Sequence, residues 1–155
     1  MARFIMTVDL RRCIGCQTCT VACRHANATP PDVQWRKVLD IETGEFPDVR
    51  RSFVPVGCMH CADPSCVSAC PVGAFTKTEL GPVVYDADKC MGCRYCMIAC
   101  PFNVPRYEWS KTIPVVRKCD GCFDRQKEGK PTACTEACPA EATVGGTREE
   151  MLAEA

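Results

Sequence analysis

The chain has 155 residues, enough for one domain or two very small ones, and its 19 Lys and Arg balance its 19 Asp and Glu. This balanced charge does not indicate nucleic acid as a partner, and no apolar run is long enough for a membrane anchor. The 16 cysteines exceed the level typical of a disulfide scaffold, but MARFIMTVDLRRC is no secretory signal, so we expect a cytoplasmic protein whose thiols bind metal.

The cysteines form four groups of four with none left over. In chain order the groups are Cys13, Cys16, Cys19 and Cys23; Cys58, Cys61, Cys66 and Cys70; Cys90, Cys93, Cys96 and Cys100; and Cys119, Cys122, Cys134 and Cys138. The last three groups end in Cys-Pro, and the flanking sequences repeat as well, which indicates an internal repeat. Three residues separate the last two cysteines of each group, a spacing that suits a single helical turn.

Two further elements are predicted outside the groups. Between the first two groups, residues 35–41 alternate as a strand, 42–45 form a turn and 51–56 form a second strand, which predicts a β-hairpin. In the tail, Thr147 and Glu150 form a capping box that predicts a short C-terminal helix.

The spacing of the first and third groups is typical of [4Fe–4S] clusters. Three thiolates in C-x2-C-x2-C reach three iron atoms of one cube through a compact loop, and the fourth cysteine leads away from that cube. In two-cluster ferredoxins a fourth cysteine followed by proline binds the other cluster. The 16 cysteines therefore predict four [4Fe–4S] clusters, with single segments serving two centres.

Zinc is the main alternative to iron and sulfide. Zinc ribbons use two C-x2-C pairs separated by a long spacer, and the fourth group, with its gap between Cys122 and Cys134, fits such a site when taken alone. The first and third groups fit zinc poorly, because three thiols lie so close together. Iron–sulfur chemistry is the interpretation for the whole chain, and iron and acid-labile sulfide near about sixteen each would support it.

The clusters change the charge of the molecule. Each oxidised cluster with its thiolates carries about −2, so four add about −8 to a chain whose own net charge is zero. Basic residues beside the ligands are expected either to be solvated surface charges or to offset this charge and raise reduction potentials. These residues are Arg11, Arg12, Arg24, Lys89, Arg94, Arg117 and Lys118.

The sequence contains no recognisable catalytic or nucleotide-binding motif. Its two histidines, His25 and His60, lie beside cysteine groups. His60 is expected either to pack or to donate a hydrogen bond to a cluster sulfur. A chain with four redox centres and no acid–base pair is predicted to carry electrons rather than to be an enzyme.

Three stretches carry a resemblance to a known family: GCMHCADPSCVSACPVGAF, DKCMGCRYCMIACPFNVPRY and RKCDGCFDRQKEGKPTACTEACPAEA. From about residue 6 to 146, the chain is similar to four-cluster ferredoxin-type subunits of molybdopterin or tungstopterin oxidoreductases, such as dimethyl sulfoxide reductase and formate dehydrogenase. The same type of subunit serves some hydrogenases and carbon monoxide dehydrogenases.

The resemblance implies how the cysteines share the clusters. The first group pairs with the fourth, and the second with the third. The implied sets are Cys13, Cys16, Cys19 and Cys138; Cys23, Cys119, Cys122 and Cys134; Cys58, Cys61, Cys66 and Cys100; and Cys70, Cys90, Cys93 and Cys96.

The implied fold is α+β, with two ferredoxin-like modules around a small core filled by clusters. Residues 57–107 would form an inner module, inserted into an outer module of residues 1–28 and 108–147. Residues 29–56 would be the hairpin insertion and 148–155 the C-terminal helix or tail.

The implied function is electron relay between the active site of a partner oxidoreductase and a further subunit, or further copies of this chain. A tungsten- or molybdenum-pterin enzyme is favoured as the partner, such as an aldehyde oxidoreductase or formate dehydrogenase. The chain lacks the long C-terminal extension and the anchor of larger members, which favours a cytoplasmic enzyme. The alternatives are a free polyferredoxin, a subunit of a hydrogenase or carbon monoxide dehydrogenase, and a maturation or scaffold protein with labile metal.

Overall fold

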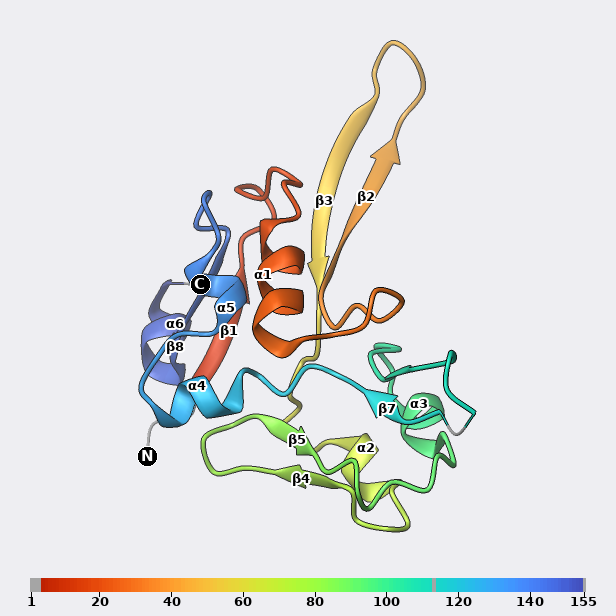
Figure 1. The fold of residues 1–155 in the computed structure, drawn as a ribbon. Coiled ribbons are helices and arrows are strands. Elements are labelled where there is room, and N and C mark those ends of the chain that lie inside the picture. Colours follow the sequence, from red (N-terminus) through yellow and green to blue (C-terminus); the bar gives the residue numbers. More distant parts are fainter. Residues whose placement is uncertain (1–3, 113, 155) are drawn as a thin grey trace.

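A computed structural model describes residues 4–112 and 114–154, and its short helices and strands are joined by loops (Figure 1). The strands are β1 (Phe4–Val8), β2 (Lys37–Thr43), β3 (Arg50–Val56), β4 (Phe75–Lys77), β5 (Val83–Tyr85), β6 (Arg106–Tyr107), β7 (Val116–Arg117) and β8 (Thr143–Thr147). The helices are α1 (Thr18–Asn27), α2 (Ser65–Ser68), α3 (Tyr95–Ala99), α4 (Phe123–Lys127), α5 (Ala133–Glu136) and α6 (Arg148–Glu154). The predicted α+β class is confirmed. Within the described ranges, no helix has the length and apolar character needed to cross a membrane.

The strands pair as four separate antiparallel ribbons, β1 with β8, β2 with β3, β4 with β5, and β6 with β7. The β1–β8 ladder joins the two ends of the chain, from Phe4 opposite Thr147 to Val8 opposite Thr143. Helix α1 packs against α5 beside this ladder (Figure 1). Segments that carry the first and last cysteine groups therefore lie side by side, while β4, β5, α2 and α3 form the other end of the molecule.

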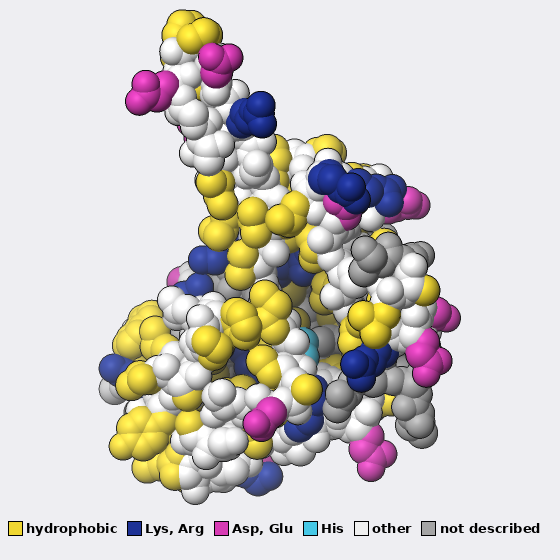
Figure 2. All heavy atoms as spheres, turned by 180° about the vertical axis from the view of Figure 1, so that it is seen from behind, with side chains coloured by type: hydrophobic (Ala, Val, Ile, Leu, Met, Phe, Trp, Pro, Cys, Tyr) yellow, Lys and Arg dark blue, Asp and Glu magenta, His cyan; other side chains and the backbone are white. Residues whose placement is uncertain are grey.

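The hairpin of β2 and β3 projects from the body as a long two-stranded arm (Figures 1 and 2). The hairpin is confirmed, but its turn spans residues 44–49 rather than the predicted 42–45. Opposite charges across the strands extend the ladder, since Arg51 lies 3.7 Å from Glu42 and pairs with Asp40. The chain then turns at Gly44, whose φ of +91° favours glycine.

A small apolar cluster is formed by residues of β4, β5, α3, β6 and β7. Its buried members are Phe75, Val83, Cys96, Tyr107 and Val116. Partly buried cysteines of the second and third groups pack against this cluster, so thiols occupy places that aliphatic side chains fill in other small domains. Apolar packing of this extent contributes little stability by itself.

The predicted capping box begins helix α6. The backbone N–H of Thr147 donates to Glu150 Oε2 at 2.9 Å, and the N–H of Glu150 donates to Thr147 Oγ1 at 3.3 Å. These reciprocal bonds satisfy two N–H groups that a helix start otherwise leaves unpaired. The C-terminal helix is confirmed to Glu154, and the last residue of the predicted tail lies outside the described residues.

Candidate metal centres

The predicted helical turn between the last two cysteines of each group is confirmed in all four groups. Helices α1, α2, α3 and α5 carry the third cysteine of their groups, and the fourth lies one turn later. In three groups a proline follows at once and the helix ends before it, because proline disfavours helix at the preceding residue. In the first group Arg24 follows instead, and α1 continues to Asn27.

Three cavities are lined by cysteines from at least two different groups each. The Cys13 cavity is lined by Cys13, Cys16, Cys19 and Cys138. The Cys58 cavity is lined by Cys58, Cys61, Cys66 and Cys100. The Cys119 cavity is lined by Cys23, Cys119, Cys122 and Cys134, together with Cys58. Each cavity thus holds three thiols of one group and the last thiol of another.

The remaining cysteines, Cys70, Cys90, Cys93 and Cys96, form what we call the Cys90 group. Burial raises the pKa of the Cys96 thiol, and the charges of Cys90, Cys93 and Cys70 raise it further. The hydroxyl of Tyr107 lies 3.7 Å from Cys96 Sγ. These interactions place the four thiols in one electrostatic neighbourhood, at the end of the molecule that contains α2 and α3.

The residue before the second cysteine of every group has a left-handed backbone. Gly15, His60, Gly92 and Gly121 have φ values of +70°, +43°, +74° and +72°. In two of these loops the backbone N–H of the glycine itself donates to the first thiol, since Gly92 N lies 3.4 Å from Cys90 Sγ and Gly121 N lies 3.3 Å from Cys119 Sγ. A backbone N–H directed at sulfur in this way favours negative charge on the thiolate.

We expect Gly15→Ala and Gly121→Ala to destabilise the cluster-bound protein by about 1–3 kcal/mol. A Cβ on Gly15 would lie 2.5 Å from the Phe53 ring, and one on Gly121 would lie 2.9 Å from Pro82, so each variant adds a clash to left-handed strain. The measurement is the temperature at which visible cluster absorbance is lost under argon.

Gly129→Ala is the matched control, because Gly129 has the same φ of +72° with open space around its would-be Cβ. If Gly129→Ala lowered the temperature of cluster loss as much as Gly15→Ala does, backbone strain would explain the whole effect. That result would contradict the predicted clash.

His60 replaces glycine in the second group, and its ring is buried. Its Nδ1 accepts a hydrogen bond from the Val83 N–H at 2.9 Å, which places the ring proton on Nε2. Burial lowers the pKa of His60 to about 3, with Lys118 and Lys77 contributing, so the ring is neutral at pH 7. Its Nε2 has no hydrogen-bond partner among the described residues, and the ring lines the Cys58 cavity. Donation to a cluster sulfur stays a prediction.

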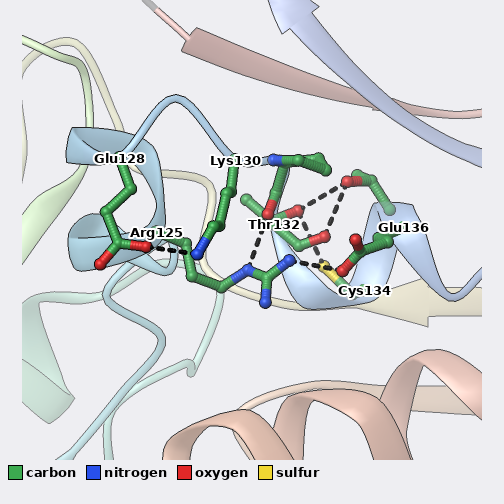
Figure 3. A network of polar contacts seen from close by, with 8 residues as sticks. Arg125, Glu128, Lys130, Thr132, Cys134 and Glu136 are labelled. Atoms are coloured by element: carbon green, nitrogen blue, oxygen red, sulfur yellow. Dashed lines mark hydrogen bonds and ion pairs between the residues drawn. The ribbon is translucent and has the colours of Figure 1, made fainter.

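The long gap in the fourth group is closed by a polar network (Figure 3). Arg125 donates from Nε to the Pro131 carbonyl at 2.9 Å and pairs with Glu136. These bonds fold the loop between α4 and α5, and Thr132 at the start of α5 has its Oγ1 3.4 Å from Cys134 Sγ. The network thereby sets Cys134 against the other thiols of the Cys119 cavity.

The thiols of Cys23 and Cys119 hold their protons in the metal-free chain. Burial raises the pKa of Cys23 to about 12, with Cys134 and Cys122 adding to the effect, and burial raises the pKa of Cys119 well above its usual value. Cys16 is exposed, and the Thr18 hydroxyl, 3.3 Å from its sulfur, lowers its pKa. Metal ligation requires thiolates, so iron must displace these protons and compensate the cost of burying negative charge.

The donor set fits [4Fe–4S] clusters. Each site has at least four thiols, the Cys13 and Cys58 cavities have mostly apolar walls, and backbone N–H groups are directed at sulfur in the Cys119 cavity and the Cys90 group. Such surroundings tune iron–sulfur clusters. In the described part of the chain, no three His, Cys, Asp or Glu side chains converge closely enough for a single metal ion.

Sequence reasoning missed one charged residue of these sites. Arg36 lies between the first two cysteine groups, far from any cysteine in sequence, yet it is buried and lines the Cys119 cavity. Of the seven basic residues that the sequence singled out, Lys118 is buried, whereas Arg24, Arg94 and others lie at the surface. No local sequence signal distinguishes them.

Comparisons with known proteins give one family. A family model described as "4Fe-4S dicluster domain" matches residues 49–148, and a second model with the same description matches residues 12–74. One chain of the anaerobic dimethyl sulfoxide reductase of Escherichia coli K12 is 40% identical over 93% of this chain and 73% of that protein. One subunit of the selenate reductase of Mesobacillus selenatarsenatis is 36% identical over 98% of this chain. Hydrogenase-2 operon protein HybA of Escherichia coli O157:H7 is 38% identical over 97% of this chain. The chain spans 64% of the length of the selenate reductase subunit and 53% of HybA.

Proposed function

Because this chain belongs to the family of ferredoxin-type subunits built from 4Fe-4S dicluster domains, we propose that it is the electron-transfer subunit of an oxidoreductase complex. It binds four [4Fe–4S] clusters, which supply one-electron redox chemistry. The polypeptide itself supplies ligands, apolar walls and charge, and catalysis belongs to a partner.

The observation that carries the proposal is the succession of thiol sites. Cys19 and Cys23 on α1 serve the Cys13 and Cys119 cavities, and Cys58 lines both the Cys119 and the Cys58 cavities. Helix α2 then carries Cys66 of the Cys58 cavity and precedes Cys70 of the Cys90 group. Each site is thus tied to the next by a short covalent segment, an arrangement that suits a relay.

We assign one cluster to each cavity and the fourth to the Cys90 group. The ligand sets are those implied by the resemblance, so the first group shares clusters with the fourth and the second with the third. The β1–β8 ladder and the packing of α1 on α5 support an outer module made from both ends of the chain around an inner module of residues 57–107.

The two ends of this succession present apolar side chains to solvent. Ile14 and Val21 are exposed beside the Cys13 cavity, and Met91 and Ile98 are exposed beside the Cys90 group. One end would face the catalytic subunit and the other a further acceptor subunit or a second copy of the chain. The relatives' names, dimethyl sulfoxide reductase and selenate reductase, support a catalytic oxidoreductase as the partner. We propose that this partner is a molybdenum- or tungsten-pterin enzyme of the cytoplasm.

Purification of the tagged chain from its own host under argon tests this function. We expect a pterin-binding catalytic subunit to purify with it, together with molybdenum or tungsten measured in the same sample. Nickel and hydrogenase or carbon monoxide dehydrogenase subunits would instead assign the relay to those enzymes. If the chain purifies without a partner and with intact clusters, the result would contradict the subunit role and favour a free polyferredoxin.

A further inference from the structure

Among the described residues, two cations are buried without an acidic partner. Arg36 is 6% exposed and Lys118 is 3% exposed. Across residues 4–112 and 114–154, neither has a carboxylate within ion-pair distance, whereas cations such as Arg12, Lys89 and Arg125 are paired at the surface. Buried charges in proteins are normally paired, because transfer from water is costly. The described side chains provide no anion for these two cations, whereas a bound cluster with its thiolates is anionic.

Arg36 lies between the Cys13 and Cys119 cavities. It lines the Cys119 cavity, and its Nη2 donates at 2.8 Å to the Oγ1 of Thr143, a residue that lines the Cys13 cavity. Its Nη1 contacts Met6 Sδ at 3.4 Å, and its Nε has no hydrogen-bond partner among the described residues. The guanidinium therefore lies between the thiols of the Cys119 cavity and the wall of the Cys13 cavity.

Lys118 lies between the Cys119 and Cys58 cavities. Its Nζ donates to the carbonyl of Cys119 at 2.6 Å and to that of Val83, and its side chain lines the Cys58 cavity. Two backbone carbonyls solvate the ammonium without neutralising it. Lys118 thus contacts a residue of the Cys119 cavity and lines the Cys58 cavity.

The Cys90 group has a different environment. Its neighbours include the hydroxyl of Tyr107. The adjacent cations Lys89 and Arg94 are both exposed, and Arg94 stacks over Trp109 at 4.6 Å. Solvent screens an exposed charge, whereas a buried charge acts at a lower effective dielectric constant.

We propose that Arg36 and Lys118 are fixed internal counter-charges of the relay, each raising the reduction potential of the two clusters between which it lies. This inference rests on the proposed function, because it requires clusters in the three cavities. Arg36 acts on the clusters of the Cys13 and Cys119 cavities, and Lys118 on those of the Cys119 and Cys58 cavities. Reduction adds negative charge to a cluster, so a nearby fixed cation favours the reduced state. The cluster of the Cys90 group is affected by neither.

The test is a redox titration of the purified holoprotein, followed by electron paramagnetic resonance, in Arg36→Met and Lys118→Met. Each variant is expected to lower the potential of two of the four components. The potential of one component is lowered in both variants, and the potential of another is lowered in neither. This pattern can be recognised without first assigning the signals to sites. The expected size is on the order of tenfold in the reduction equilibrium constant, about 59 mV for one electron.

Arg24→Gln is the matched control, because Arg24 follows a predicted ligand directly but is exposed. It removes the same charge and is expected to leave all four potentials within about threefold in the equilibrium constant. Arg36→Lys keeps the charge and is expected to keep the potentials. If Arg36→Met fails to bind clusters, Arg36→Gln is the second variant. Cluster loss in both, with clusters retained in Arg36→Lys, would support the counter-charge role, and loss in all three would overturn it.

Failure of this inference is distinguishable from failure of the proposed function. Full iron and sulfide content in Arg36→Met and Lys118→Met with unchanged potentials would overturn the counter-charge role and leave electron transfer intact. Equal shifts of all four components would also overturn it, because they would reflect net charge rather than position. A wild-type chain that binds no iron would instead overturn the proposed function.

Discussion

Removal of iron and sulfide under anaerobic conditions is expected to unfold most of the chain. The buried apolar cluster contains only Phe75, Val83, Cys96, Tyr107 and Val116, most other buried apolar residues among those described are small side chains or cysteines, and the sheets are isolated two-stranded ribbons. Such ribbons are marginally stable by themselves, as are helices as short as α2 and α5, which have 4 residues each. Ligation by sixteen cysteines crosslinks the loops and short helices that join these ribbons, so the free energy of cluster binding is largely the free energy of folding.

Circular dichroism and amide hydrogen exchange, recorded before and after chelation, measure this effect. We expect loss of most secondary structure and of exchange protection, with recovery when iron and sulfide are restored under reducing conditions. The hairpin of β2 and β3 provides an internal comparison, because its ladder contains no cysteine. A native-like spectrum after complete removal of iron would contradict the prediction.

Replacement of the last cysteine of one group is expected to damage a cluster held mainly by another group. Cys100 follows the third-group helix α3 but lines the Cys58 cavity with Cys58, Cys61 and Cys66. Cys100→Ser should therefore alter the same electron paramagnetic resonance component as Cys58→Ser. The expected result is loss of one of four clusters or its conversion to a three-iron form, because serine is a poor substitute for a thiolate ligand.

Cys96→Ser is the matched control for this experiment. Cys96 lies one helical turn before Cys100 on the same segment, yet its electrostatic neighbours are Cys90, Cys93 and Cys70. It should alter a different component, and the double variant of Cys96 and Cys100 should alter two. If Cys96→Ser and Cys100→Ser changed the same component, the proposed ligand sets would be wrong and each group would bind its own cluster.

The sequence by itself determined the chemistry of the sites and much of the local structure. Ligand spacing is a short-range property, so C-x2-C and C-x3-C predict loops and single helical turns, which the structure contains in every group. The capping box of Thr147 and Glu150 is equally local and is confirmed. The hairpin was predicted with its turn misplaced, because cross-strand pairs of Arg51 with Asp40 and Glu42, which lengthen the ladder, do not follow from strand periodicity.

Only the tertiary structure decided which residues from distant groups line the same cavity and which charges are buried. Cys13 and Cys138 meet because β1 pairs with β8 and α1 packs on α5, contacts between opposite ends of the chain. No sequence signal indicates the position of Arg36. In sequence Lys118 cannot be distinguished from the six other basic residues beside ligands, and only its burial in the structure sets it apart. The physical reason is that ligand spacing is set by the covalent chain, whereas the dielectric surroundings of a charge depend on every segment that packs around it.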